Sequence, residues 1–187
     1  MKLDMSLPEL VNEAETIARD VQSTFGQLTA EQLNWKPNAD SWSVAQCLDH
    51  LIAANGQMLS AFDPVITGTK QTTFIERLPV WPGLWGRMMI KVVSPQGTKK
   101  FKAPPGAVPS SSKLDPQIVG KFADLQRDVS RKIKAIENLN PDKIIITSPF
   151  AGFITYSLLD ACRVIVAHER RHFEQAQRVM AAQGFPT

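Results

Sequence analysis

The residues of this chain best suited to chemistry are its three histidines, His50, His168 and His172. His168 and His172 are four residues apart, so on a helix their side chains project from one face, one turn apart. Two imidazole nitrogens in this arrangement can bind one divalent metal ion, at about 2.0–2.1 Å for zinc. His50 lies in a different helical segment and would add a third ligand if the two helices pack together. The simpler alternative is that the histidines are hydrogen-bonded packing residues on helix flanks.

Residues 168–172 read His-Glu-Arg-Arg-His and also match the H-E-x-x-H pattern of zinc peptidases, in which the glutamate is the general base. No further histidine follows, which argues against a peptidase, because the usual downstream third ligand is absent. A helical wheel at about 100° per residue places Glu169 near the centre of the apolar stripe. Glu169 is therefore a candidate general base or, equally, a buried carboxylate hydrogen-bonded to a residue such as Asn12 or Asn55.

Four segments with helical periodicity are expected to position these residues. They extend over residues 6–26, 43–62, 115–140 and 156–183. The first two begin with capping boxes, because Ser6 is followed by Glu9, and Ser43 by Gln46. Apolar residues at three- and four-residue steps give each segment one face to bury. The histidines lie in the second and fourth segments.

A long connection, residues 63–114, separates the second and third helical segments. It contains seven of the thirteen prolines and carries a net charge of +6, whereas the whole chain carries +3. Short helices are expected within residues 77–93, and extended loop elsewhere. Four amphipathic helices with one long connection predict an all-α four-helix bundle with a crossover between the second and third helices. The length of 187 residues fits a single domain, residues 1–187.

Composition excludes several classes of function. The basic excess lies in a proline-rich connection and not along a structured element with aromatic residues, so no nucleic-acid binding is expected. No run reaches the roughly 18 apolar residues of a membrane span, so no membrane partner is expected. The two cysteines, Cys47 and Cys162, lie within helical segments and are interpreted as free thiols in a reducing compartment. The N-terminus lacks the pattern of a secretory signal, and the cytoplasm is the predicted location.

Two motifs carry a resemblance to a known family. Residues 41–51, Ser-Trp-Ser-Val-Ala-Gln-Cys-Leu-Asp-His-Leu, and residues 167–176, Ala-His-Glu-Arg-Arg-His-Phe-Glu-Gln-Ala, resemble the helix motifs of the DinB-like (YfiT-like) superfamily. The resemblance extends over nearly the whole chain. It implies a four-helix bundle in which His50, His168 and His172 bind nickel, zinc or iron at a site open to solvent. It also implies a homodimer and a relation to bacillithiol S-transferases and mycothiol-dependent maleylpyruvate isomerase.

Three hypotheses for function follow. The first is a metal-dependent enzyme that activates a low-molecular-weight thiol, or water, for transfer to a small electrophilic substrate. The second is a metal-dependent hydrolase with Glu169 as the general base. The third is a metal-binding or interaction bundle without catalytic activity.

Overall fold

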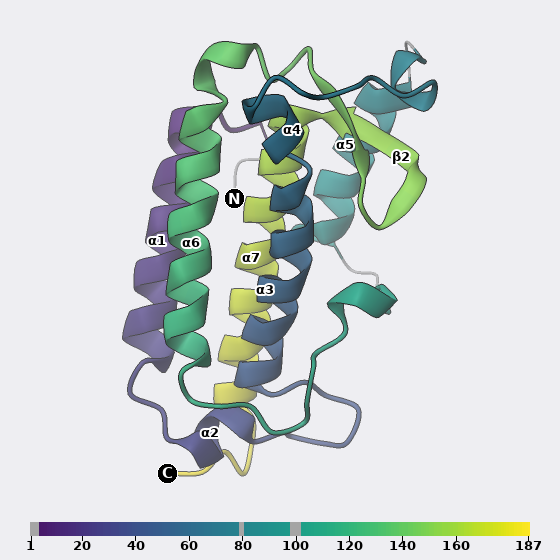
Figure 1. Ribbon diagram of the computed structural model, residues 1–187. Helices are drawn as coiled ribbons and strands as arrows, with labels where there is room; N and C mark the ends of the chain where they lie inside the picture. Colours follow the sequence, from purple (N-terminus) through teal and green to yellow (C-terminus); the bar gives the residue numbers. More distant parts are fainter. Residues whose placement is uncertain (1–3, 79–80, 98–101) are drawn as a thin grey trace.

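Four long helices form the body of the molecule in the computed structural model, which describes residues 4–78, 81–97 and 102–187 (Figure 1). They are α1 (Leu7–Phe25), α3 (Val44–Ser60), α6 (Ile118–Ala135) and α7 (Leu158–Met180). Both α1 and α3 pack against α6 and α7. Helices α3 and α6 run in the same direction, so the chain between them must return along the bundle (Figure 1). The predicted all-α, four-helix architecture with a crossover is confirmed.

Serine residues begin three of the long helices. At α1, the Ser6 N–H donates to Glu9 Oε2 at 2.7 Å. At α3, Ser43 Oγ accepts from the Gln46 N–H at 3.1 Å, and the Gln46 side chain accepts from the Ser43 N–H at 3.2 Å. These contacts satisfy N–H groups that a helix leaves unpaired in its first turn. Both predicted capping boxes are therefore present. Helix α7 starts about two residues later than predicted, because Ser157 is its N-cap.

A short antiparallel hairpin, β1 (Ile145–Ser148) and β2 (Ala151–Ser157), precedes α7 and was not predicted. Tyr156, which was assigned to the fourth helix, instead pairs with Ile146 across the two strands. The Tyr156 ring is buried, and its hydroxyl donates to Met58 Sδ at 3.2 Å. The third helical segment is shorter than the predicted range of 115–140. Helix α6 begins at Ile118 and ends at Ala135, and a 3₁₀ turn, η3 (Glu137–Leu139), follows.

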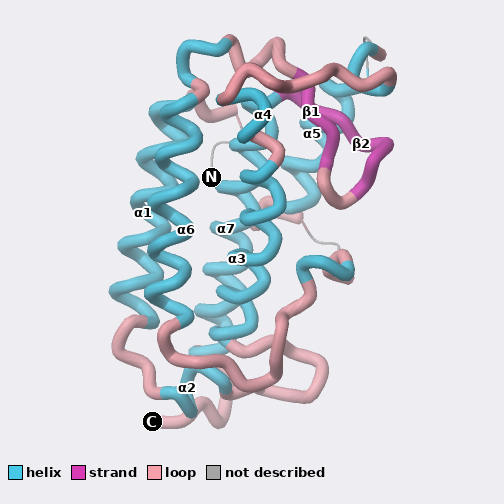
Figure 2. The backbone as a smooth tube through the Cα atoms, in the orientation of Figure 1, coloured by secondary structure: helices cyan, strands magenta, loops and turns pink. Residues whose placement is uncertain are grey.

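The connection between α3 and α6 is partly folded. Its elements are α4 (Asp63–Ile66), η1 (Ile75–Arg77), α5 (Trp81–Val93) and η2 (Pro105–Ala107). Helix α5 packs against β2 and α7, so the first half of the connection adds a layer to the outside of the bundle. After η2 the chain passes as extended loop towards α6 (Figure 2). A further short helix, α2 (Ala30–Asn34), joins α1 to α3.

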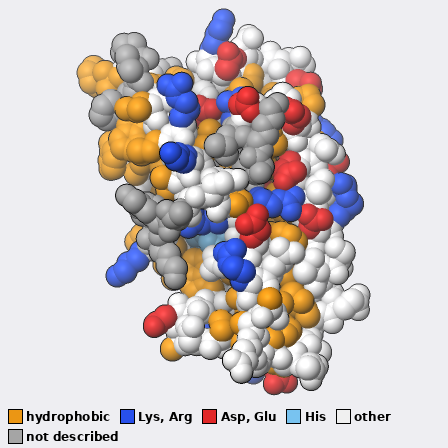
Figure 3. Space-filling view, turned by 180° about the vertical axis from the view of Figure 1, so that it is seen from behind, with side chains coloured by type: hydrophobic (Ala, Val, Ile, Leu, Met, Phe, Trp, Pro, Cys, Tyr) orange, Lys and Arg blue, Asp and Glu red, His pale blue; other side chains and the backbone are white. Residues whose placement is uncertain are grey.

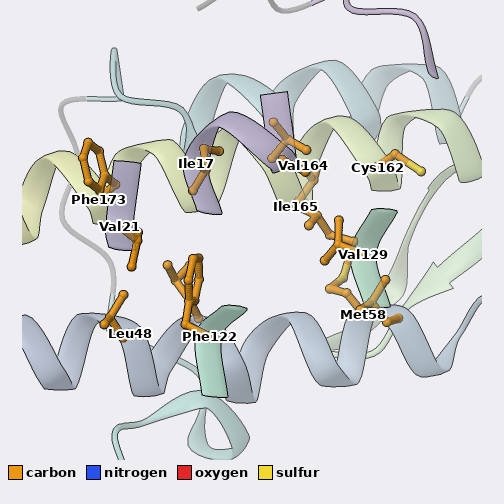
Figure 4. Packing of buried hydrophobic residues seen from close by; sticks show 14 of the residues in the cluster. Ile17, Val21, Leu48, Met58, Phe122, Val129, Cys162, Val164, Ile165 and Phe173 are labelled. Atoms are coloured by element: carbon orange, nitrogen blue, oxygen red, sulfur yellow. The ribbon is translucent and has the colours of Figure 1, made fainter. Parts of the chain in front are cut away.

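The core consists of side chains from all four long helices (Figure 4). Phe25 of α1 and Phe173 of α7 pack with ring centroids 5.6 Å apart, and Phe122 of α6 is fully buried. Cys47 and Cys162 are buried free thiols. Burial raises the pKa of Cys47 to about 12, so this thiol stays neutral. Within the described residues, no helix combines the length and apolar character needed to cross a membrane.

Candidate metal centre

The structure brings the three histidines together from two helices in contact, His50 from α3 and His168 and His172 from α7. Nε2 of His50 lies 3.2 Å from Nε2 of His168. The ring centroids of the three pairs are 4.5 to 5.0 Å apart. One nitrogen of each ring lies within 4.8 Å of the other two. Nitrogens from two separate helices thus lie close enough together to bind one metal ion.

The spacing of these nitrogens fits a divalent metal ion. Three nitrogens at 2.0–2.1 Å from a tetrahedral ion would be roughly 3.4 Å apart. The 3.2 Å separation of the His50 and His168 nitrogens is close to this value. Nδ1 of His172 is buried and has no hydrogen-bond partner in the described part of the chain. Imidazole ligands suit zinc, nickel and iron, so the residues present are compatible with each of the predicted metals.

The imidazoles are held in their neutral form. Burial lowers the pKa of His168 to about 3, with smaller contributions from His50 and from the positive charge of Arg171. Burial, together with His168, His50 and Arg171, also lowers the pKa of His172 well below its ordinary value. Burial likewise lowers the pKa of His50. Metal ions bind the neutral imidazole, so at pH 7 the cluster presents lone pairs without having to lose protons.

Trp42 forms one wall of the cluster. Its ring stacks on His172, with the centroids 5.8 Å apart and the planes at 24°. It also contacts His50 at a centroid distance of 4.9 Å. Trp35, which is close to Trp42 in sequence, instead packs edge-on against Phe185 at 5.5 Å. Trp42 therefore restricts the rings of two histidines, whereas Trp35 packs against the C-terminal segment.

A backbone carbonyl from the connection orients His50. Nδ1 of His50 lies 2.5 Å from the carbonyl oxygen of Ala107, at the end of η2. A carbonyl can only accept, so Nδ1 carries the hydrogen, and Nε2 keeps its lone pair on the side of His168. Sequence reasoning missed this contact. Every residue has a carbonyl, so no residue type marks the position.

Glu169 points into the core of the bundle. It is fully buried, and its Oε1 accepts from Asn55 Nδ2 and from Gln126 Nε2, both at 2.7 Å. Burial raises the pKa of Glu169 to about 8, although both amides lower it. The expected partner Asn55 is found, whereas Gln126 was not anticipated. The structure thus joins Glu169 to α3 and α6 through core hydrogen bonds.

One side of the cluster faces solvent. His168 is partly exposed, whereas His50 and His172 are buried. On the face behind the view of Figure 1, histidine surface is visible among lysine and arginine side chains (Figure 3). Arg171 lies in this region of α7 and donates to the carbonyl of Val92 at 2.7 Å, which ties the end of α5 to α7. The partly exposed His168 therefore lies on a basic face of the molecule.

Comparison with known proteins is consistent with this arrangement. A family model described as the DinB superfamily matches residues 13–176. A search of curated proteins and a search of solved structures give no match. The matched region includes all three histidines, all of α3 and α6, and most of α1 and α7. Because the match extends over most of the chain, the protein belongs to the DinB superfamily.

Proposed function

We propose that this protein is a metal-dependent enzyme that activates a low-molecular-weight thiol for transfer to a small electrophile, with His50, His168 and His172 as the metal ligands. The observation that carries the proposal is the convergence of three neutral imidazoles, one of them reachable from solvent. Nickel, zinc or iron held by three histidines would keep an open position, where a bound thiol or water becomes more acidic. The resemblance to bacillithiol S-transferases and mycothiol-dependent maleylpyruvate isomerase favours a thiol.

Residues around the histidines support this chemistry. The positive charge of Arg171 acts on His168 and His172, because it lowers the pKa of both. The same charge would stabilise a thiolate or a substrate carboxylate beside the cluster. Trp42 adds an apolar wall against two of the rings. A cationic group beside an apolar wall suits a small anionic thiol better than a peptide.

The surroundings of Glu169 favour thiol transfer over hydrolysis. A general base must be ionised and within reach of the water that it deprotonates. With a pKa of about 8, Glu169 is mostly protonated at pH 7, and its Oε1 is engaged by Asn55 and Gln126. Glu169 is also fully buried in the core, away from the water that a base would have to deprotonate.

A thiol-transfer assay tests the proposal. Protein loaded with zinc or nickel is mixed with cysteine, glutathione or bacillithiol and with monobromobimane. The sulfur attacks the bromomethyl carbon, so that a C–S bond forms, the C–Br bond breaks, bromide leaves, and the thiol proton passes to solvent. We expect faster conjugation with at least one thiol, and loss of this acceleration in His168→Ala or with EDTA. Equal rates for the wild type and His168→Ala, or ester hydrolysis without any thiol, would contradict the proposal.

We further propose that the protein is a single cytoplasmic domain that forms homodimers. The buried free thiols Cys47 and Cys162 are compatible with a reducing compartment. Leu84 and Met88 of α5 and Phe153 of β2 are exposed, and hydrophobic side chains gather on this part of the surface in Figure 3. Exposed apolar surface of this kind often marks a protein contact.

A further inference from the structure

The last part of the connection is fastened to α3 by polar side chains. We call residues 106–114 the return segment. Gln57 Nε2 donates to the carbonyl of Gly106 at 2.5 Å. Nearer the start of α3, Asp49 Oδ2 accepts from the backbone N–H of Ser110 at 2.6 Å. Later residues of the return segment contact earlier residues of α3, so the segment runs antiparallel to the helix.

The fastening continues towards α6. Gln46 Nε2 donates to the carbonyl of Ser111 at 3.2 Å. The Asn34 amide, at the end of α2, exchanges two hydrogen bonds with the backbone of Leu114, at 2.7 and 2.8 Å. In every one of these contacts a side chain of the bundle binds a backbone group of the return segment. Side chains outside the return segment therefore hold its backbone in place at four residues.

The carbonyl that orients His50 lies between two of these contacts. Ala107, fully buried, follows Gly106 directly and precedes Ser110 by three residues. On α3, His50 likewise lies between Asp49 and Gln57. A Cβ at Gly106 would lie 3.0 Å from Gln57 Nε2, so glycine permits a close approach there. Loosening either contact would allow the Ala107 carbonyl to leave Nδ1 of His50.

We propose that Gln57 and Asp49 are positioning residues for the metal centre, which hold the return segment so that the Ala107 carbonyl keeps Nε2 of His50 directed at the other two histidines. This inference rests on the proposed function, because it requires a metal at the three histidines. Outer-shell partners of metal-binding histidines typically contribute roughly 10- to 100-fold to metal affinity. Through these hydrogen bonds, the connection between α3 and α6 becomes part of the metal centre.

The competing explanation is that these hydrogen bonds only stabilise the connection. A purely stabilising role predicts a lower melting temperature and unchanged zinc affinity in the folded protein. A positioning role predicts weaker zinc binding at temperatures where the variant is fully folded. It also predicts that His50 of the metal-free protein changes from the Nδ1–H tautomer to a mixture, which histidine ¹⁵N NMR detects.

Zinc affinity, measured by competition with a chromophoric chelator, tests the proposal in Gln57→Ala, Asp49→Ala and the double variant. Asp49→Asn keeps an acceptor for the Ser110 N–H but loses the charge, so it separates positioning from electrostatic attraction. Gln57→Glu keeps the size of the side chain but loses the donor. Gln177→Ala, at an exposed position of α7, is the matched control. We expect the double variant to lose roughly tenfold or more in zinc affinity, Gln57→Glu to be weakened, and Asp49→Asn and Gln177→Ala to bind like the wild type.

The outcomes separate the two proposals. Zinc binding by the wild type with equal affinity in the double variant would overturn the positioning role and leave the metal centre intact. Absence of binding of zinc, nickel and iron(II) by the wild type would overturn the proposed function, and the positioning role with it. If circular dichroism shows that the double variant is unfolded, the single variants decide, since each removes one contact with the return segment, made by a partly exposed side chain.

Discussion

Glu169→Gln is expected to gain stability over the wild type as the pH rises from about 5 to 8. Glu169 has an ordinary pKa of 4.5 and, through burial, a pKa of about 8 in the folded protein. Between these values the folded protein binds more protons than the unfolded chain, so the free energy of unfolding of the wild type falls as the pH rises. Glutamine cannot ionise and avoids this loss. The full shift corresponds to on the order of 3–5 kcal/mol.

Urea unfolding at several pH values, with EDTA present so that metal binding does not contribute, measures this difference. Glu137→Gln, at an exposed position after α6, is the matched control and should follow the wild type at every pH. The stability difference between Glu169→Gln and the wild type should grow up to about pH 8, the folded-state pKa, and then level off. Parallel pH profiles for Glu169→Gln and the wild type would show that Glu169 is ionised in the core at neutral pH.

His168→Ala is expected to bind zinc more than about 100-fold more weakly than the wild type, since losing a ligand should exceed the roughly 10- to 100-fold effect of losing an outer-shell partner. The two histidines that remain lie on different helices and are buried, so only two imidazoles would hold the ion. His168 is partly exposed, and alanine favours helix at this position in α7, so the variant should fold.

Chelator competition with His168→Ala, beside Gln177→Ala as an exposed control on the same helix, measures this loss. Circular dichroism and the melting temperature of the metal-free proteins establish that the bundle is intact. Zinc affinity in His168→Ala equal to that of the wild type would mean that the ion binds elsewhere.

The features predicted from sequence are those that depend on neighbouring residues. The capping pairs of Ser6 with Glu9 and of Ser43 with Gln46 act within one helical turn, so they located two helix starts. The spacing of His168 and His172 has a direct meaning on any helix. The long connection indicated a crossover, because a chain of that length can pass from one end of a bundle to the other.

The features that were missed were not determined by local residue patterns alone. The hairpin had a local signal, since Ile145, Ile146 and Thr147 are β-branched and favour strands. Tyr156, however, also fits the apolar spacing of the helix that follows, and only its pairing with Ile146 assigns it to a strand. The backbone carbonyl of Ala107 has no signature in residue type at all.

Glu169 illustrates both cases. Its place on the apolar stripe follows from helical periodicity, and burial was therefore expected. Asn55 was anticipated as a partner because it lies on the inner stripe of its own helix. Gln126 was not, since the choice between partners depends on how α6 crosses α7, and no local rule determines that crossing.

The zinc K-edge X-ray absorption spectrum of the loaded wild-type protein is the most direct test of the metal centre. Binding by His50, His168 and His172 predicts three nitrogen neighbours at about 2.0–2.1 Å, together with the outer-shell scattering of three imidazole rings and one further light-atom neighbour. A spectrum that requires one imidazole or none, with oxygen atoms completing the shell, would contradict the three-histidine centre.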